Sequence, residues 1–524
     1  MFMRLVKSAL SVGFFTILSR ITGFIRDILM AKYIGTGLVM DALVIAIKIP
    51  SFLRRIFAEG AFNASFVPIF AGLNVESKKQ AFKFIQDILN LMMAVLVAVV
   101  IVFEIFMPLV VHVFLIGSNE ELTTLAIFFC RITFPFILFI SLTALFSGIL
   151  NSLDRFSVAA SSPIAGNISI IAVLCLIDPT KIAQGTSVAM AIMISGLVQL
   201  LWVAIPCWLQ GIRPHFKWPQ STPSIQSFGK RMVPAAIGSG ALQINLMIDV
   251  MIASLLPLGT NSYLYYADRL YQLPISITGT AMGTVLLPVL SRLWREGQTQ
   301  SALHTQNRAI EFSMLITFPA MIGLMYLAEP LVCLLFERGK FDAVSTHAVA
   351  QTVFGFSTGL PAYILIKIFS SSFFARQDTL TPILTALASM VLNIIFNLIL
   401  ISHLKHLGIA LATSLAAWGN AALLGYLLFR RHLIRFDRSL GLYFMKLAIA
   451  SLITLATLIG CRTLCQPLIE YPDLWIRLTG MGLTGVGGLV TYTLCCYGMK
   501  CLKFHEYQEH SVNNNNEKKT IEPV

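Results

Sequence analysis

The chain has 524 residues, of which 56% are hydrophobic and only 12% are charged. Soluble globular proteins carry about 25% charged residues, so this composition excludes an ordinary soluble domain and indicates a polytopic membrane protein. The net charge of +13 is expected to lie mostly in short basic loops. A nucleic-acid-binding function would need a soluble basic domain, and the sequence contains none.

Apolar segments follow one another along the whole chain. Residues 88–116 are too long and too apolar for anything but a membrane-spanning helix, which needs about 20 apolar residues. The first apolar stretch ends without a signal-peptidase site, so we interpret it as a retained helix. About 14 spans are predicted, centred near residues 20, 48, 98, 138, 168, 195, 243, 275, 322, 360, 392, 418, 453 and 487.

The distribution of lysine and arginine orients these spans. With the N-terminus in the cytoplasm, roughly 22 Lys and Arg residues fall in cytoplasmic segments and roughly 7 outside, as the positive-inside rule requires. The tail that ends in NNNNEKKTIEPV also lies in the cytoplasm and is expected to be disordered. We therefore predict an all-α multi-pass membrane protein with both termini in the cytoplasm.

The sequence matches itself weakly at a period of about 220 residues. Residues 25–37 lie over residues 247–259, which pairs Asp27 with Asp249 and places Gly37 on a second glycine. One period holds six spans, so both copies start on the same side of the membrane. Transporters built from such parallel repeats bind their substrate between the repeats.

The repeat predicts two pseudo-symmetric lobes of six helices each. The predicted segments are an N-terminal lobe (1–210, helices 1–6), a C-terminal lobe (211–432, helices 7–12), two further helices (433–502, helices 13–14) and a polar tail (503–524).

Charged side chains are concentrated in spans one, two and eight. A charge at the centre of a spanning helix costs about 2.5–3.5 kcal/mol on insertion scales, and such residues are functional by default. Helix-breaking Gly and Pro residues nearby indicate a wet cavity, and the guanidinium group binds phosphate oxygens bidentately. We therefore predict a cationic cavity for a phosphate or pyrophosphate. The bases are Arg20, Arg26, Lys48, Arg54, Arg55 and Arg269, and the acids are Asp27, Asp41, Glu59 and Asp268.

Some of these residues have other interpretations. Arg54 and Arg55 can mark the cytoplasmic end of span two under the positive-inside rule. Arg55 and Glu59 are spaced to pair along a helix. Arg20 can be a structural partner of Asp41.

A second polar set lies in spans seven, eleven and twelve. Oxygen ligands from three helices suit a small hard cation such as Na⁺. Hydrogen bonds that hold the helices together are an equally good interpretation. The set consists of Asp249, Asn393, Asn397 and Thr413.

Two polar outliers have no assigned role, Lys367 in span ten and Arg131 in span four. Arg131 can simply lie near a helix end. The nine cysteines are scattered without a metal-binding spacing. The sequence contains no Walker A, G-x-S-x-G or H-E-x-x-H motif, so it predicts neither an ATPase nor a hydrolase of those classes.

Four segments resemble signature segments of the MurJ family, also called MviN. They are SRITGFIRD (19–27), the long stretch 41–70, YYADRLYQLP (265–274) and ARQDTLTP (375–382), and the resemblance extends over the whole chain. The family comprises lipid II flippases of bacterial cell-wall synthesis, within the multidrug/oligosaccharidyl-lipid/polysaccharide exporter superfamily. The resemblance implies a transporter and not an enzyme.

The resemblance also implies where the substrate binds. It implies a central cationic cavity between two lobes, and a groove for the polyprenyl tail at helices thirteen and fourteen. The position where the family often has Glu is Gln272 here. Asp27, Arg55, Glu59 and Asp268 are candidates for pairing or gating, and the Asp249 set falls where family members can bind Na⁺. The residues matching the cavity are Arg20, Arg26, Arg54, Arg269, Asp41 and Ser262, with Lys48 beside them.

The function expected from this resemblance is movement of lipid II from the inner to the outer leaflet of the bacterial inner membrane by alternating access. Lipid II and membrane lipids are the expected partners, together with other cell-wall synthesis proteins. The alternatives are an exporter of another cargo, a membrane enzyme acting on lipid-linked sugar, and a structural scaffold. An arginine-rich cavity disfavours a pump for cationic drugs, and the short loops disfavour an enzyme.

Overall fold

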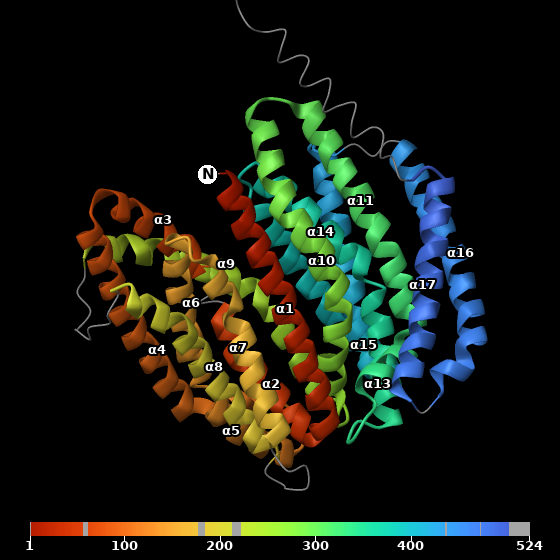
Figure 1. Ribbon diagram of the computed structural model, residues 1–524, viewed down its shortest axis with the longest axis horizontal. Helices are drawn as coiled ribbons and strands as arrows, with labels where there is room; N and C mark the ends of the chain where they lie inside the picture. Colours follow the sequence, from red (N-terminus) through yellow and green to blue (C-terminus); the bar gives the residue numbers. More distant parts are fainter. Residues whose placement is uncertain are drawn as a thin grey trace, which may run out of the picture. The chain divides into compact units, whose positions relative to one another are not determined.

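The computed structural model describes residues 2–55, 61–176, 184–211, 222–434, 438–471 and 473–501. In these ranges every regular element is an α-helix (Figure 1), which confirms the predicted all-α class. Glu59 and the predicted tail 503–524 lie outside the described residues.

The helices of the first half are α1 (Phe2–Ile34), α2 (Leu38–Arg54), α3 (Ala61–Glu76), α4 (Lys78–Phe114), α5 (Glu120–Thr133), α6 (Phe136–Ser152), α7 (Phe156–Leu176) and α8 (Gln184–Leu209). Those of the second half are α9 (Pro223–Ser254), α10 (Thr260–Arg295), α11 (Thr299–Tyr326), α12 (Ala328–Phe336), α13 (Ala343–Ser357), α14 (Leu360–Phe374), α15 (Leu380–Arg430), α16 (Arg438–Ile469) and α17 (Leu474–Gly498). Every predicted span centre falls inside one of these helices.

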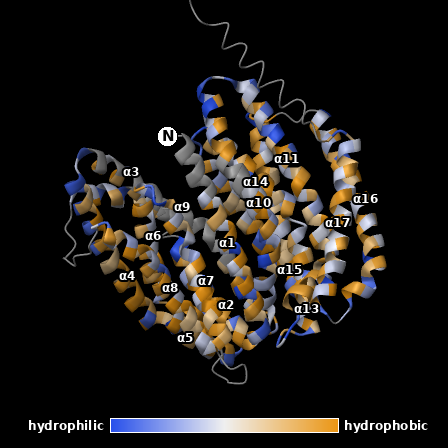
Figure 2. Ribbon diagram, in the orientation of Figure 1, coloured by the Kyte–Doolittle hydropathy of each residue, from blue (hydrophilic) through white to orange (hydrophobic). Residues whose placement is uncertain are grey.

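Apolar residues cover most of these helices (Figure 2). Among the described residues, nine helical segments are long and apolar enough to cross a membrane. One of them, α15, contains two predicted spans separated at Lys405, whose φ of 49° breaks the helix. Charge-bearing α1, α2 and α10 are not among the nine, so the count of 14 stays a prediction.

The chain forms two compact units. The first comprises residues 1–269, 335–352 and 386–413, and the second comprises residues 270–334, 353–385 and 414–524. Stacked Phe62, Phe66 and Phe84 lie in the core of the first unit. Aliphatic residues of α10, α11, α14, α15 and α16 form the core of the second. The lobe boundaries predicted from the sequence stay a prediction.

The internal repeat is visible in the turns. Residues with positive φ are uncommon, because only glycine adopts this conformation without strain. Four such residues recur about 220 positions later at the equivalent helix ends, which confirms the duplication. The pairs are Gly37 and Gly259 (φ 103° and 99°), Gly117 and Gly339 (78° and 63°), Asp154 and Gln377 (60° and 63°), and Gly211 and His432 (85° and 56°).

Candidate functional site

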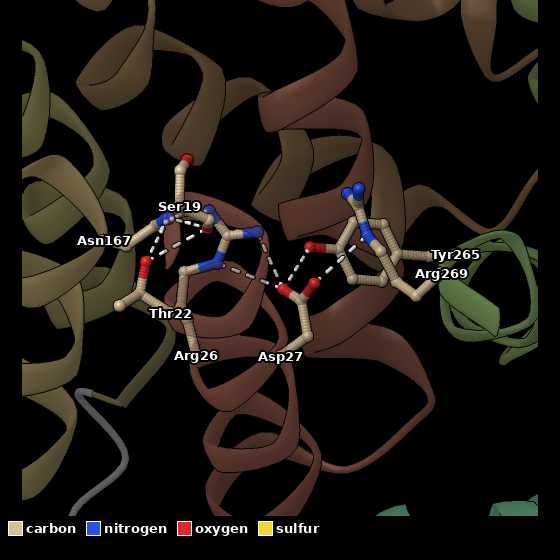
Figure 3. Close-up of polar contacts among 7 residues, drawn as sticks. All are labelled: Ser19, Thr22, Arg26, Asp27, Asn167, Tyr265 and Arg269. Carbon is tan, nitrogen blue, oxygen red and sulfur yellow. Dashed lines mark hydrogen bonds and ion pairs between the residues drawn. The ribbon is translucent and has the colours of Figure 1, made fainter. Parts of the chain in front are cut away.

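Asp27 of α1 is the centre of a buried ionic cluster (Figure 3). Its side chain is 2% exposed, and its Oδ1 lies 2.8 Å from Arg26 Nη2. The hydroxyl of Tyr265 on α10 donates to the same oxygen at 2.9 Å. Arg269, one turn further along α10, places its Nε 3.1 Å from the other oxygen, Oδ2. A single carboxylate therefore holds two guanidinium groups.

Asn167 of α7 fixes the position of Arg26. Its side-chain oxygen accepts a hydrogen bond from Arg26 Nη1 at 3.0 Å. Its amide nitrogen donates to the carbonyl oxygen of Ser19 at 3.1 Å and to Thr22 Oγ1 at 3.2 Å. The arginine is thus oriented before any ligand binds.

Part of the Arg269 guanidinium group stays accessible to a ligand. The group lies over the Tyr265 ring, with Cζ 4.6 Å from the ring centroid. Its two terminal nitrogens point away from Asp27 (Figure 3). The side chains of Arg269 and Arg26 keep 31% and 21% of their accessible surface. Two positive charges around one negative charge leave a net positive site, which suits an oxyanion.

Further charged residues extend this cluster along α2. Lys48 is half-buried and interacts electrostatically with Asp268, Asp249 and Arg55. Arg54 ends α2 and Arg55 follows it directly, and both side chains are half-buried.

The structure brings Asp41 and Ser262 together, as predicted for residues of one site. Their side chains hydrogen-bond to each other, however. Asp41 Oδ2 accepts from the backbone N–H of Gly259 at 2.6 Å. Its Oδ1 accepts from the backbone N–H and the hydroxyl of Ser262, at 2.7 and 2.5 Å. A carboxylate at a helix N-terminus satisfies otherwise unpaired N–H groups and the helix dipole. Asp41 thus caps α10. Its oxygens bond there and not to Arg20, which lies exposed on α1. The substrate-binding role of Asp41, Ser262 and Arg20 stays a prediction.

The second polar set is also assembled. Thr413 Oγ1 lies 3.4 Å from Asp249 Oδ2, and Asn393 Nδ2 donates to Thr413 at 3.3 Å. Asn397 Nδ2 donates to Asn393 Oδ1 at 3.0 Å. Within the part of the chain that the structure describes, Asp249 Oδ1 and Asn397 Oδ1 are buried acceptors without a hydrogen-bond donor. Buried oxygens left over in this way fit a cation better than they fit simple helix-to-helix bonding.

Sequence analysis missed two members of the ionic cluster. Tyr265 carries a usable signal, because it lies four residues before Arg269 on a helix and must share its face. Asn167 carries none, because only the packing of α7 against α1 brings it to Arg26. Arg131 lies in the last turn of α5, as its plainer interpretation predicts.

The duplicated helical fold and the charges buried in its spanning helices define a multi-pass membrane transporter. A multidrug transporter of the MATE family, in an inward-facing conformation, has the same fold, with a TM-score of 0.66 and 16% identity over 79% of this chain and 94% of that one.

Comparison of the sequence identifies the family more narrowly than comparison of the fold does. The profile described as lipid II flippase MurJ matches residues 30–475. A probable lipid II flippase MurJ of Rhizobium meliloti is 40% identical over 95% of this chain and 94% of its own length. Its counterpart in Rickettsia prowazekii is 34% identical, with coverages of 96% and 99%. A solved lipid II flippase MurJ in an inward closed conformation has a TM-score of 0.77 and 28% identity, with coverages of 93% and 99%.

The chain therefore belongs to the lipid II flippase MurJ family. This membership confirms the predicted transporter class, as opposed to an enzyme, and confirms a multi-pass membrane location.

Proposed function

We propose that this protein moves lipid II, the undecaprenyl-pyrophosphate-linked precursor of peptidoglycan, from the inner to the outer leaflet of the bacterial cytoplasmic membrane. Family membership supports the cargo. The observation that carries the chemistry is the pair of guanidinium groups, Arg26 and Arg269, held around the single buried carboxylate of Asp27.

The pyrophosphate of the cargo is the natural ligand of these arginines. Arg26 and Arg269 keep part of their surface accessible and are already oriented by Asp27, so little ordering is needed when an oxyanion binds. Arg54 and Lys48 add positive charge from α2. The prenyl tail stays in the lipid along α16 and α17. A membrane potential of 100 mV, negative inside, favours outward movement of each negative charge by about 2.3 kcal/mol, so alternating access needs no ATP.

The first prediction concerns these arginines. In cells depleted of the protein, we expect lipid II to become protected from a membrane-impermeant enzyme that cleaves it from outside. Arg26→Ala and Arg269→Ala should each fail to restore cleavage, because the remaining guanidinium is neutralised by Asp27. Arg438→Ala, an exposed residue at the start of α16, is the control and should restore it.

Two outcomes would contradict this proposal. Normal cleavage in cells that contain only Arg269→Ala would remove the arginine from the mechanism. Unchanged accessibility of lipid II after depletion would indicate another lipid-linked sugar as the cargo, because any polyprenyl pyrophosphate presents the same charge.

We also propose that Asp249, Asn393, Asn397 and Thr413 hold Na⁺. The unpaired acceptor oxygens of Asp249 and Asn397 support this site. With one carboxylate, the set suits a monovalent cation better than a divalent one. When Na⁺ is bound, it supplies a positive charge that neutralises Asp249 and ties α9 to α15.

The second prediction tests this site by thermal unfolding of the purified protein. Replacing choline chloride by NaCl should raise the Tm of the wild type, because a ligand that binds only the folded state stabilises it. Asp249→Asn should abolish the increase, whereas the exposed Asp154→Asn should keep it. An equal Na⁺ effect in Asp249→Asn would rule the site out.

A further inference from the structure

Arg26 is held by two acceptors that differ in charge. Its Nε and Nη2 both donate to one oxygen of Asp27, at 3.1 and 2.8 Å, and its Nη1 donates to the side-chain oxygen of Asn167 at 3.0 Å. Two bonds to a single atom let the guanidinium group pivot about that atom. The third bond comes from another helix, α7, and fixes the plane of the group (Figure 3). Asn167 therefore sets the direction in which Arg26 presents its remaining N–H groups.

This direction matters because Arg26 has N–H groups left for a ligand. A guanidinium group carries five N–H donors. Within the part of the chain that the structure describes, Asp27 and Asn167 accept three of them, which leaves one N–H on each terminal nitrogen. The side chain of Arg26 keeps 21% of its accessible surface. Two N–H groups of one guanidinium suit two oxygens of a phosphate group.

The amide of Asn167 has one possible orientation. Its nitrogen lies 3.1 Å from the main-chain oxygen of Ser19 and 3.2 Å from Thr22 Oγ1. A carbonyl oxygen only accepts hydrogen bonds and an arginine only donates them, so the NH2 group must face Ser19 and the oxygen must face Arg26. The position requires a side chain that donates at one end and accepts at the other. An ionised aspartate of the same size only accepts.

Asn167 also orients Arg26 without neutralising it. In the ionic cluster, Arg26 and Arg269 share the one carboxylate of Asp27, so one positive charge is in excess. An acidic residue at position 167 would accept the same bond from Arg26 but would cancel this excess. A neutral acceptor gives the orientation and keeps the charge, and an anionic ligand needs both.

A bond between helices can also serve packing alone, and Asn167 does join α7 to α1. The pair Ser11 and Ser157 shows this simpler case, because their hydroxyl oxygens join the same two helices at 2.7 Å without a charged partner. Packing accounts for the bonds that the Asn167 nitrogen makes to α1. It does not account for the oxygen, which is directed at a guanidinium group that Asp27 already holds.

We infer that Asn167 is a positioning residue that determines the charge specificity of the transporter, because it orients Arg26 toward the cargo and leaves the site its excess positive charge. The inference rests on the proposed function, since it takes the anionic lipid-linked cargo as the ligand of Arg26. Asn167 acts through the arginine and does not itself contact the cargo.

Binding of lipid II to the purified full-length protein in nanodiscs tests the inference. Asn167→Ala should weaken binding about fivefold, the cost of ordering one long side chain when the ligand binds. Asn167→Asp should weaken it about fiftyfold, because the charge that attracts the anion is lost as well. The affinity of Asn167→Asp should also depend less on salt concentration than that of the wild type. A residue needed only for packing would give the reverse order, because aspartate keeps the size of asparagine and alanine does not.

Matched variants separate these effects from damage to the fold. Ser169→Ala, also on α7, should bind normally, because Ser169 donates to the main-chain oxygen of Gly166 in its own helix at 2.8 Å. Should Asn167→Asp fail to accumulate, Asn167→Ala decides: weaker binding with the salt dependence of the wild type supports the inference, and wild-type affinity overturns it.

The outcome for Arg269→Ala distinguishes this inference from the proposed function. Unchanged binding in both variants of Asn167, with binding lost in Arg269→Ala, would overturn the inference and keep the proposed function. Equal weakening by alanine and aspartate, with the salt dependence unchanged, would also overturn it. Unchanged binding in Arg269→Ala as well would overturn both.

Discussion

At the scale of single residues, Asp27 determines what its neighbours can do. Removing one partner of a buried charge pair leaves the other uncompensated, which is strongly unfavourable. Here the imbalance is built in, because Arg26 and Arg269 share one carboxylate. An anionic ligand would balance the excess positive charge, in keeping with the binding role that we propose for this cluster.

Asp378, between α14 and α15, shows a different use of a carboxylate. Partial burial alone would raise its pKa, but hydrogen bonds from the backbone and hydroxyl of Thr381 and the contact with Arg431 Nη1 at 2.6 Å hold the pKa at about 2. An unfolded aspartate has a pKa near 3.9. The group therefore stabilises the fold fully above about pH 4 and loses this effect as the pH falls toward 2.

The third prediction follows from this pKa. Asp378→Asn should lower the Tm at pH 7, and the difference from the wild type should shrink between pH 4 and pH 2, where the wild-type carboxyl becomes neutral. Thermal unfolding over this pH range measures it, with Asp154→Asn as the control. A difference that stays constant down to pH 2 would contradict the assignment.

At the scale of elements, the turn between α12 and α13 is docked on the end of α1. Lys340 N–H donates to the main-chain oxygen of Lys32 at 3.0 Å, and the hydroxyls of Thr36 and Ser345 are 2.6 Å apart. A Cβ on Gly339 would stand 2.2 Å from that same Lys32 oxygen. Main-chain atoms cannot move aside cheaply, so the joint requires glycine.

The fourth prediction tests this joint. Gly339→Ala should lower the Tm by more than Gly297→Ala does. Both glycines have positive φ, 63° and 70°, and alanine pays about 1–2 kcal/mol for that conformation at either position. Only the substitution at Gly339 adds a clash with main-chain atoms, because nothing lies within 4 Å of a Cβ at Gly297. Equal decreases in Tm would show that the joint is not close-packed.

At the scale of the whole molecule, an internal duplication determines the order of the helices along the chain. The recurring left-handed turns mark two copies of one helix pattern, followed by α16 and α17. The small residues Gly480, Thr484 and Gly488 of α17 face α16 and let the two helices approach closely. The predicted six spans in each copy, together with this pair, would give an even number of spans.

The fifth prediction is that both termini lie in the cytoplasm. A green fluorescent protein fused to either end should fluoresce, and alkaline phosphatase fused to either end should be inactive, because the basic loops stay on the cytoplasmic side. An active phosphatase at the C-terminus would mean an odd number of spans.

The sequence by itself determined the membrane class, the helix positions and the repeat. Apolar length and periodicity are local properties of the sequence, and they decide which segments can span the bilayer. It also brought forward Arg26, Asp27 and Arg269, since a charge within an apolar run is visible without a fold. Only the tertiary structure decided their partners. Asn167 reaches Arg26 and Asp41 caps α10 because distant helices pack together, and no local pattern encodes which helices will meet.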